Sequence, residues 1–307
     1  MCVGGTCQCE LGKCGAAAVV DLAGVIANSY DVDDQFVYYS KGDVEIYRSP
    51  VAGGAPSLIA SDLKVIEEVR IAGSNVVYTW LDNTGTGQYK LKKVPAQGGQ
   101  VTTLDSSTNP VEGAISFHLA VRNIGADWAA YWWARTKMNE VSVATGAPIT
   151  TFLPGNYNPE GPMVTDQLYL YSATYSFNGY TFSRDGTLLD GYGTSSFETY
   201  DLAVDSTDNL YFTDNSTGSI LLIKPNKHTA VYTGLGTLSG LATDDSDLYW
   251  ITSSGKDYEI LRGPKTGGSP TSLYKGKGLY TYSARKLKLQ GGFVYWIADD
   301  KIWRVAQ

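Results

Sequence analysis

Cysteine is absent from nearly the whole chain. The four cysteines of the 307-residue sequence are Cys2, Cys7, Cys9 and Cys14, in the spacing C-x4-C-x-C-x4-C. An even number packed this closely predicts two small disulfides in an exported protein. A metal knot and a reduced, unstructured tail are alternatives, although the first lacks a nearby histidine or a C-x2-C pair. Residues 15–307 contain no cysteine, so packing must hold their fold together.

Charged residues are also scarce. They make up 18% of the sequence, and the net charge is −7. A nucleic-acid-binding protein normally presents a basic face. The densest basic cluster, residues 285–288, is too short to form one. We therefore expect no nucleic-acid partner.

Long apolar runs are missing as well. No run approaches the roughly 18 apolar residues that a membrane-spanning helix needs, so we predict no transmembrane segment. No signal-peptide pattern opens the sequence, which resembles the start of a mature protein. Together with the clustered cysteines, this predicts a secreted or cell-surface protein whose signal sequence is not among these residues.

Histidine occurs only twice, which argues against a zinc or iron centre with several histidine ligands. We expect His228 to be exposed in a turn. We expect His118 to be a hydrogen-bonded structural residue, with a catalytic role as the alternative. No G-x-S-x-G, P-loop or Rossmann fingerprint is present.

Tyrosine, tryptophan and glycine are abundant, with 22, 7 and 34 copies, and this composition favours strands and turns. One pattern recurs: an apolar residue, a tyrosine, aromatic or β-branched residues, and a polar turn. Seven copies about 43 residues apart are typical of four-stranded propeller blades. The long second interval predicts an enlarged loop around 109–127. The repeated tyrosines, which we expect to be packing residues, are Tyr38, Tyr78, Tyr131, Tyr169, Tyr211, Tyr249 and Tyr295.

The residues between the tyrosines repeat too. Turns such as 50–54, 95–99 and 264–268 end in Gly-Gly, which supplies the positive φ that tight hairpins need. Each unit then has room for four strands, and no stretch has helical periodicity. The sequence predicts an all-β fold: a seven-bladed β-propeller of four-stranded antiparallel blades.

The two ends of the chain complement each other. The seventh unit has three strands and then the chain stops, whereas residues 17–22 form an apolar strand ahead of the first unit. We predict that this N-terminal strand completes the last blade, which removes the open edges. The predicted organisation is a Cys-rich segment over 1–15 and a propeller over 16–307.

The fifth unit reads Leu210-Tyr211-Phe212-Thr213-Asp214, followed by Ile220 and Leu221. It resembles the YWTD repeat of low-density lipoprotein receptor-type propellers and the YWT-containing repeats of bacterial surface propellers. The likeness extends to all units at the tyrosine, but the Thr-Asp pair occurs once, and YWTD receptor domains have six blades. The resemblance implies the fold and an extracellular setting, and it does not imply a shared ligand.

Propeller ligands usually bind where the innermost strands begin, around the central channel. Aligning the units places one residue per blade there, and a second ring lies one residue earlier. Such groups could serve as general acids and bases or as cation ligands; an ordinary polar lining with water in the channel is the alternative. The acid–base candidates are Glu68, His118, Asp201 and Lys286. The ligand-binding candidates are Ser29, Glu67, Glu68, His118, Glu160, Tyr200, Asp201, Arg285 and Lys286.

Two further features have structural and functional interpretations. Aspartate-rich turns before the tyrosine strands, at 31–34, 205–208 and 244–247, could bind calcium, but hairpin turns also favour Asp. Four aromatic residues near turns or strand ends could stack on sugars, but propeller blades also need aromatic residues for packing. They are Trp128, Trp133, Tyr175 and Phe177. We expect no cofactor and leave calcium open.

These features predict a monomeric, non-enzymatic, extracellular propeller that binds a protein, a small molecule or a glycan, or acts as a scaffold. One alternative is a lyase or hydrolase acting at the channel mouth. Another is a lectin, which the blade-to-blade variation of the rim disfavours, because lectin propellers tend to repeat their site.

Overall fold

The structure is a computed structural model of residues 1–307. It describes residues 2–3, 6–7, 17–21, 27, 29–42, 44–62, 64–82, 88–108, 118–134, 137–152, 162–176, 179–185, 187–192, 201–279, 284–299 and 301–307. The predicted loop at 109–127 lies partly outside these ranges, since 109–117 are not described.

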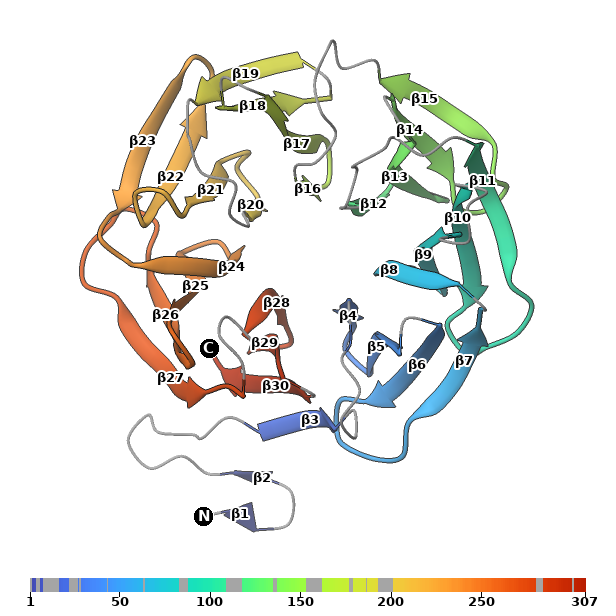
Figure 1. Ribbon diagram of the computed structural model, residues 1–307, viewed down its shortest axis with the longest axis horizontal. Helices are drawn as coiled ribbons and strands as arrows, with labels where there is room; N and C mark the ends of the chain where they lie inside the picture. The colour runs from blue at the N-terminus through green and yellow to red at the C-terminus, as the bar shows by residue number, and fades with distance from the viewer. Residues whose placement is uncertain are drawn as a thin grey trace.

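Seven four-stranded antiparallel sheets surround a central axis, as predicted (Figure 1). The inner strands are β4 (Tyr30–Val32), β8 (Val65–Ala72), β12 (Leu119–Asn123), β16 (Met163–Thr165), β20 (Leu202–Val204), β24 (Thr237–Thr243) and β28 (Arg285–Gln290). The second strands are β5 (Phe36–Lys41), β9 (Asn75–Leu81), β13 (Trp128–Ala134), β17 (Leu170–Ser176), β21 (Leu210–Asp214), β25 (Asp247–Ser254) and β29 (Phe293–Ala298).

Each blade continues outward through two more strands. The third strands are β6 (Glu45–Pro50), β10 (Gln88–Pro95), β14 (Lys137–Ser142), β18 (Gly179–Arg184), β22 (Ser219–Lys224), β26 (Asp257–Pro264) and β30 (Lys301–Ala306). The outer strands are β7 (Ser57–Ser61), β11 (Thr102–Thr108), β15 (Pro148–Phe152), β19 (Thr187–Tyr192), β23 (Lys227–Tyr232), β27 (Thr271–Lys277) and, in the seventh blade, β3 (Ala17–Asp21).

Strand β3 closes the ring. It pairs antiparallel with β30, with Ala18 opposite Trp303 and Val20 opposite Ile302 (Figure 1). The prediction that an N-terminal strand completes the last blade is therefore confirmed. Ahead of it, β1 (Cys2–Val3) pairs with β2 (Thr6–Cys7), which sets Cys2 opposite Cys7. The cysteine side chains, and all of Cys9 and Cys14, lie outside the described residues, so the two disulfides stay a prediction.

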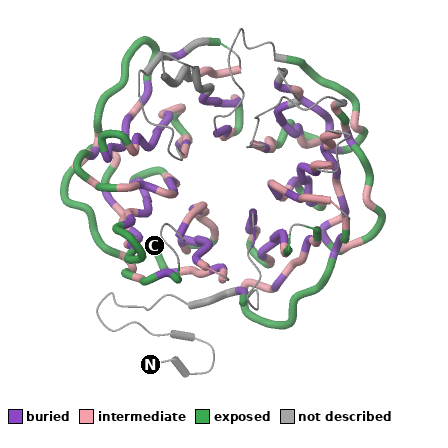
Figure 2. Tube along the Cα trace, viewed as in Figure 1, coloured by how far each residue is buried: buried purple, intermediate pink, exposed green. Residues whose placement is uncertain are grey.

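The hydrophobic core is divided among the interfaces between blades. Seven clusters of buried apolar residues each combine side chains from two adjacent blades. Val20 of β3, for example, joins Tyr39 of the first blade and Ile302 of the seventh. Burial follows the same plan, because the second strands are buried and much of the outer strands is exposed (Figure 2). Each blade therefore depends on both neighbours for its apolar contacts.

Six of the seven predicted tyrosines, all but Tyr169, are buried, and some of them also donate a hydrogen bond that the repeat did not reveal. Tyr38 and Tyr249 donate their hydroxyl hydrogens to aspartates five residues earlier, Asp33 at 3.1 Å and Asp244 at 2.7 Å. The other oxygen of each aspartate accepts backbone N–H groups of the turn. The turn interpretation of these aspartates is confirmed, since their carboxylates hold the hairpin and the tyrosine together.

The fourth unit corrects one prediction. Tyr171, not Tyr169, occupies the repeated position, because Tyr171 is 1% exposed and donates to Asp166, five residues earlier, at 3.1 Å. It lies opposite Val164 of β16. The alignment of this unit was therefore wrong by two residues. Tyr169 and Tyr171 point to the same face of the chain, because side chains in a strand alternate with period two.

Candidate site at the channel mouth

The inner strands are sheet edges, and side chains from neighbouring blades bond their unpaired backbone groups. Ser29 Oγ accepts the Val69 N–H at 3.1 Å, and Asp31 Oδ2 accepts the Ile71 N–H at 3.0 Å, which joins the first blade to the second. Asp201 Oδ2 accepts the Leu241 N–H at 3.1 Å between the fifth and sixth blades. Ser29, Asp31 and Asp201 therefore have a structural role, because they accept backbone N–H groups that would otherwise have no partner at these sheet edges.

The same device joins the seventh blade to the first. The Tyr30 hydroxyl donates to the Lys286 carbonyl at 2.7 Å, and Arg285 Nη2 donates to the Ala27 carbonyl at 3.0 Å. Lys288 Nζ lies 3.3 Å from Asp31 Oδ1. The polar-lining interpretation thus holds for these contacts, although Tyr30, Arg285, Lys286 and Lys288 also line the central cavity.

A cavity of about 540 Å³ lies among the inner strands. Residues from all seven blades line it. They are Tyr30, Asp31, Glu68, Arg70, His118, Ala120, Val121, Pro162, Met163, Val164, Thr165, Asp201, Leu202, Ser239, Leu241, Arg285, Lys286, Leu287 and Lys288.

Glu68 is the centre of an ion-pair cluster. Its carboxylate lies 2.5 Å from Arg70 Nη2 and 3.2 Å from Lys286 Nζ, and the residue is 7% exposed. Burial alone would raise the pKa of Glu68. The positive charges of Arg70 and Lys286, with a contribution from His118, outweigh burial and lower that pKa to about 2. Glu68 is therefore ionised at neutral pH, which suits it to ion pairing better than to proton donation.

Asp201 behaves in the opposite way. Burial raises the pKa of its carboxyl group to about 6, against the N–H groups of Leu241 and Leu202 and the charges of Lys288 and Lys286. Each carboxyl oxygen already accepts one of those N–H groups. The group is thus half-protonated near pH 6 but is held in a fixed position by the backbone.

Lys286 has a left-handed backbone, with φ of 56°. It lies in a bulge between Arg285 and Lys288, where the pairing of β28 with β29 shifts register. Burial lowers the pKa of its ammonium group, and the charge of Glu68 opposes that shift. A non-glycine residue in this conformation is strained, and such strain is frequent where a side chain is held for a function.

The structure brings five of the predicted residues into one cavity: Glu68, His118, Asp201, Arg285 and Lys286. Ser29 lies beside it, with its hydroxyl 3.4 Å from Arg70 Nη1. Glu67 does not line the cavity, and its charge acts on Tyr89 instead. Glu160 and Tyr200 lie outside the described residues.

Pro162 takes the rim position that the alignment gave to Glu160. Its carbonyl accepts the Ala173 N–H, just as the Ser29 and Asp201 carbonyls accept the Ser40 and Thr213 N–H groups. The two-residue slip in the fourth unit explains the error. The rim prediction also missed Asp31, Arg70 and Lys288, which line the cavity two positions after the predicted rim residues. Residues two apart in a strand point to the same face, so the next such residue along each inner strand could have been predicted as well.

The arrangement is suited to binding charged groups. In the described part of the chain, no three His, Cys, Asp or Glu side chains lie close enough to hold a metal ion. His228 is exposed, as expected, but it lies in strand β23 opposite Ile223 and not in the turn. Trp133 is 3% exposed and packs within the blades. Trp128 is half-buried and packs on the second and third blades. Phe177 and the Tyr175 side chain lie outside the described residues.

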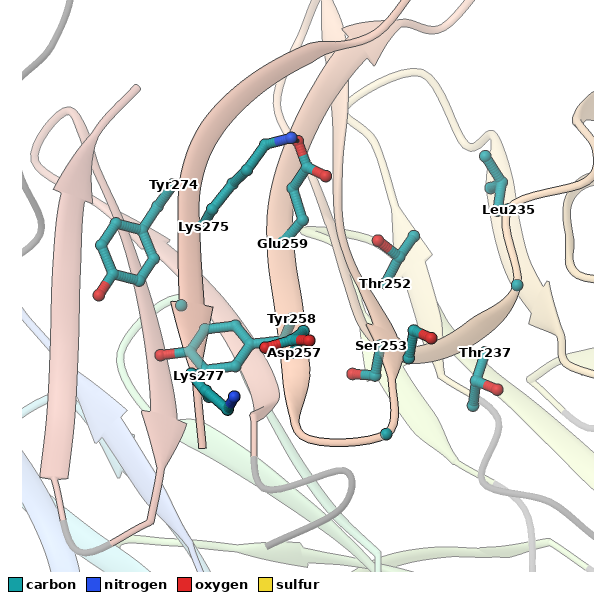
Figure 3. A pocket seen from close by; sticks show the side chains of 14 residues that line it. Leu235, Thr237, Thr252, Ser253, Asp257, Tyr258, Glu259, Tyr274, Lys275 and Lys277 are labelled. Carbon is teal, nitrogen blue, oxygen red and sulfur yellow. Dashed lines mark ion pairs between the residues drawn. The ribbon is translucent and has the colours of Figure 1, made fainter. Parts of the chain in front are cut away.

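A second hollow of about 910 Å³ lies on the sixth blade (Figure 3). It is open to solvent and is lined by the β25–β26 turn, β27 and the loop at 235–237. Lys275 Nζ lies 3.4 Å from Glu259 Oε1 along one side, and Asp257 lies opposite Lys277 where β26 pairs with β27. This hollow combines no ionisable groups from several blades, so the central cavity is the better candidate site.

No described helix is long and apolar enough to cross a membrane. No protein-family model matches the chain, and no curated protein sequence matches it.

Solved structures are similar over nearly the full length. A chain of the "Crystal Structure of Mitotic Checkpoint Complex" is 13% identical, with a TM-score of 0.69 over 98% of both chains. YCF48 from Cyanidioschyzon merolae is 10% identical, with a TM-score of 0.67 over 96% of this chain and 99% of that one. The computationally designed Ika8 protein is 13% identical, with a TM-score of 0.59 over 94% and 99%. At these identities the likeness shows the β-propeller fold alone.

Proposed function

We propose that this chain is a non-enzymatic binding propeller whose site is the mouth of the central channel. One observation supports this most: the acid–base candidates converge on a cavity, yet the two carboxylates among them are engaged. Glu68 is paired with two cations, and both oxygens of Asp201 accept backbone N–H groups. A rigid, charged cavity of about 540 Å³ is suited to holding a ligand.

The partner class is a small molecule or a protein segment that reaches the channel. A similar propeller belongs to a structure described as a mitotic checkpoint complex, which supports an interaction role by analogy only. The clustered cysteines and the YWTD-like unit support a secreted or cell-surface location.

A thermal-shift panel of carboxylates, phosphates, amines and oligosaccharides tests the site. A ligand of the channel mouth should raise the Tm of the wild-type protein and of Lys275→Gln, which changes only the outer hollow. It should raise the Tm of Lys286→Gln much less. Equal increases in Lys286→Gln and wild type, for every ligand found, would contradict the proposal.

A lyase or hydrolase at the same mouth is the second candidate, because the pKa of Asp201, raised to about 6, is suited to proton transfer near neutral pH. If the panel reveals a substrate, this candidate requires turnover that falls at least about a hundredfold in Asp201→Asn or His118→Ala. Retained turnover in both variants would exclude it.

A further inference from the structure

The central cavity has two unlike sides. The seventh, first and second blades supply its cations and two of its three acids: Arg285, Lys286, Lys288, Asp31, Glu68 and Arg70. The third to sixth blades contribute mostly apolar groups, including Met163, Val164, Leu202 and Leu241. His118 and Asp201 lie on that apolar side. A ligand filling the cavity therefore meets charge on one side and hydrocarbon on the other.

The charged side has an excess of cations. Four basic side chains line the cavity, against three carboxylates, one of which is half-neutral near pH 6. This positive excess contrasts with the net charge of −7 of the whole chain. The lining of the cavity thus carries one more basic side chain than carboxylates, in a protein that is acidic as a whole.

Arg285 differs from the other three cations in its partners. Glu68 faces Arg70 and Lys286, and Asp31 faces Lys288. Within the described residues, no carboxylate lies within ion-pair distance of Arg285, whose resolved bond runs to the Ala27 carbonyl. Burial lowers the pKa of its guanidinium group without an acid to oppose it. A half-buried guanidinium that no described carboxylate pairs with is a strong binding group for an anion.

We infer that the cavity binds a small organic anion, a carboxylate or phosphate ester with an apolar body. Its acidic group pairs with Arg285 and Lys286, and its body packs on Met163, Val164 and Leu241. The volume of about 540 Å³ is in the range of small-molecule sites. This inference rests on the proposed binding function and names the ligand class for the same site.

The test uses the fluorescent dye anilinonaphthalene sulfonate, an anion with an apolar body, on the full chain. We expect saturable binding that hexanoate displaces, while its neutral analogue hexanamide and inorganic phosphate displace it at least about tenfold less well. Arg285→Gln should weaken dye binding about tenfold or more, because a charge-assisted bond is lost. Lys275→Gln, in the outer hollow, is the matched control and should bind as wild type does.

Lys286→Gln serves as a second variant if Arg285→Gln melts at a much lower temperature than wild type. Equal displacement by hexanamide and hexanoate would overturn the inference, as would phosphate acting as well as hexanoate or unchanged binding in both variants. If hexanamide displaced the dye as well as hexanoate does, but Lys286→Gln still weakened dye binding, the proposed binding function would stand and only the anionic ligand class would be wrong. An absence of saturable binding together with a panel free of ligands would overturn both proposals.

Discussion

Asp201 and Glu68 have pKa values that shift in opposite directions although they line one cavity. The folded-state pKa of Asp201 is about 6, above its ordinary value of 3.8. The folded protein therefore holds this proton more tightly than the unfolded chain does. The contribution of Asp201 to stability is fully present below pH 3.8 and is lost as the pH rises through 6.

Asp201→Asn should remove this dependence. Between pH 4 and pH 7 the free energy of unfolding of the wild type should fall relative to that of the variant. A pKa raised from 3.8 to about 6 corresponds to about 3 kcal/mol at most. The partial exposure of Asp201 to solvent makes the expected difference smaller. Urea unfolding at pH 4, 5, 6 and 7 measures it. Parallel profiles for the two proteins would show that the carboxyl titrates normally.

Glu68→Gln should destabilise the protein by about 3 kcal/mol at pH 7, since it leaves Arg70 and Lys286 facing each other without their shared anion. The folded-state pKa of Glu68 is lowered, so its contribution is present above pH 4.5 and is lost as the pH falls toward 2. Glu259→Gln is the control, because its pair with Lys275 is largely exposed and should be worth under about 1 kcal/mol. Similar urea midpoints for both variants would refute the buried-cluster assignment.

At the scale of the element, the fourth blade shows where sequence reasoning reached its limit. Two Leu-Tyr pairs follow each other there, and a shift of two residues keeps every side chain on its face of the strand. Hydrophobic pattern alone could not choose between them. The aspartate five residues before the tyrosine, shared by Tyr38, Tyr171 and Tyr249, would have done so.

Tyrosine-to-phenylalanine substitutions test this register. Tyr171→Phe should lower the free energy of unfolding by about 1 kcal/mol or more, because Asp166 loses its buried donor. Tyr169→Phe keeps the ring that stacks with Arg184 and should be nearly neutral. Thermal melting of both variants compares their stabilities. A larger loss of stability in Tyr169→Phe would assign the repeated position to Tyr169 instead.

Asn215 joins two blades through both ends of its amide. Its Nδ2 donates to the Leu238 carbonyl at 2.9 Å, and its Oδ1 accepts the Leu238 N–H at 2.5 Å. Asn215→Ala should therefore cost about 1–2 kcal/mol, and Asn215→Asp, which keeps the acceptor, should cost less. The urea midpoint should be highest for the wild type, lower for Asn215→Asp and lowest for Asn215→Ala. An unchanged midpoint for Ala would mean that these bonds add nothing to stability.

At the scale of the whole molecule, the fold was largely predictable because every blade repeats the same demand for a buried aromatic strand and a tight turn. Blade number and closure followed from counting those units. The cavity was less predictable, since its charges pair across blades that are far apart in sequence. Glu68 and Lys286 were found as rim residues, but their pairing with each other depends on closure of the ring.

Removing the closing strand should be far more damaging than removing the Cys-rich segment. A chain starting at residue 16 should melt close to the full-length protein. A chain starting at residue 23 loses β3 and the buried Val20, and it should unfold at a Tm lower by 10 °C or more, of the order expected for several kcal/mol. Similar melting curves for the two truncations would contradict the role of β3.

Closure by β3 also determines when the ring can be completed during synthesis. β3 is the first propeller strand to be synthesised, and its partner β30 is the last. At typical elongation rates of roughly 5–20 residues per second, β3 waits about 15 to 60 s before that partner exists. Until then both edges of the growing ring are open to other chains. Pairing of β3 with β30 therefore completes the ring only after the seventh blade has been made, and a chaperone that assists closure would act where these two strands meet.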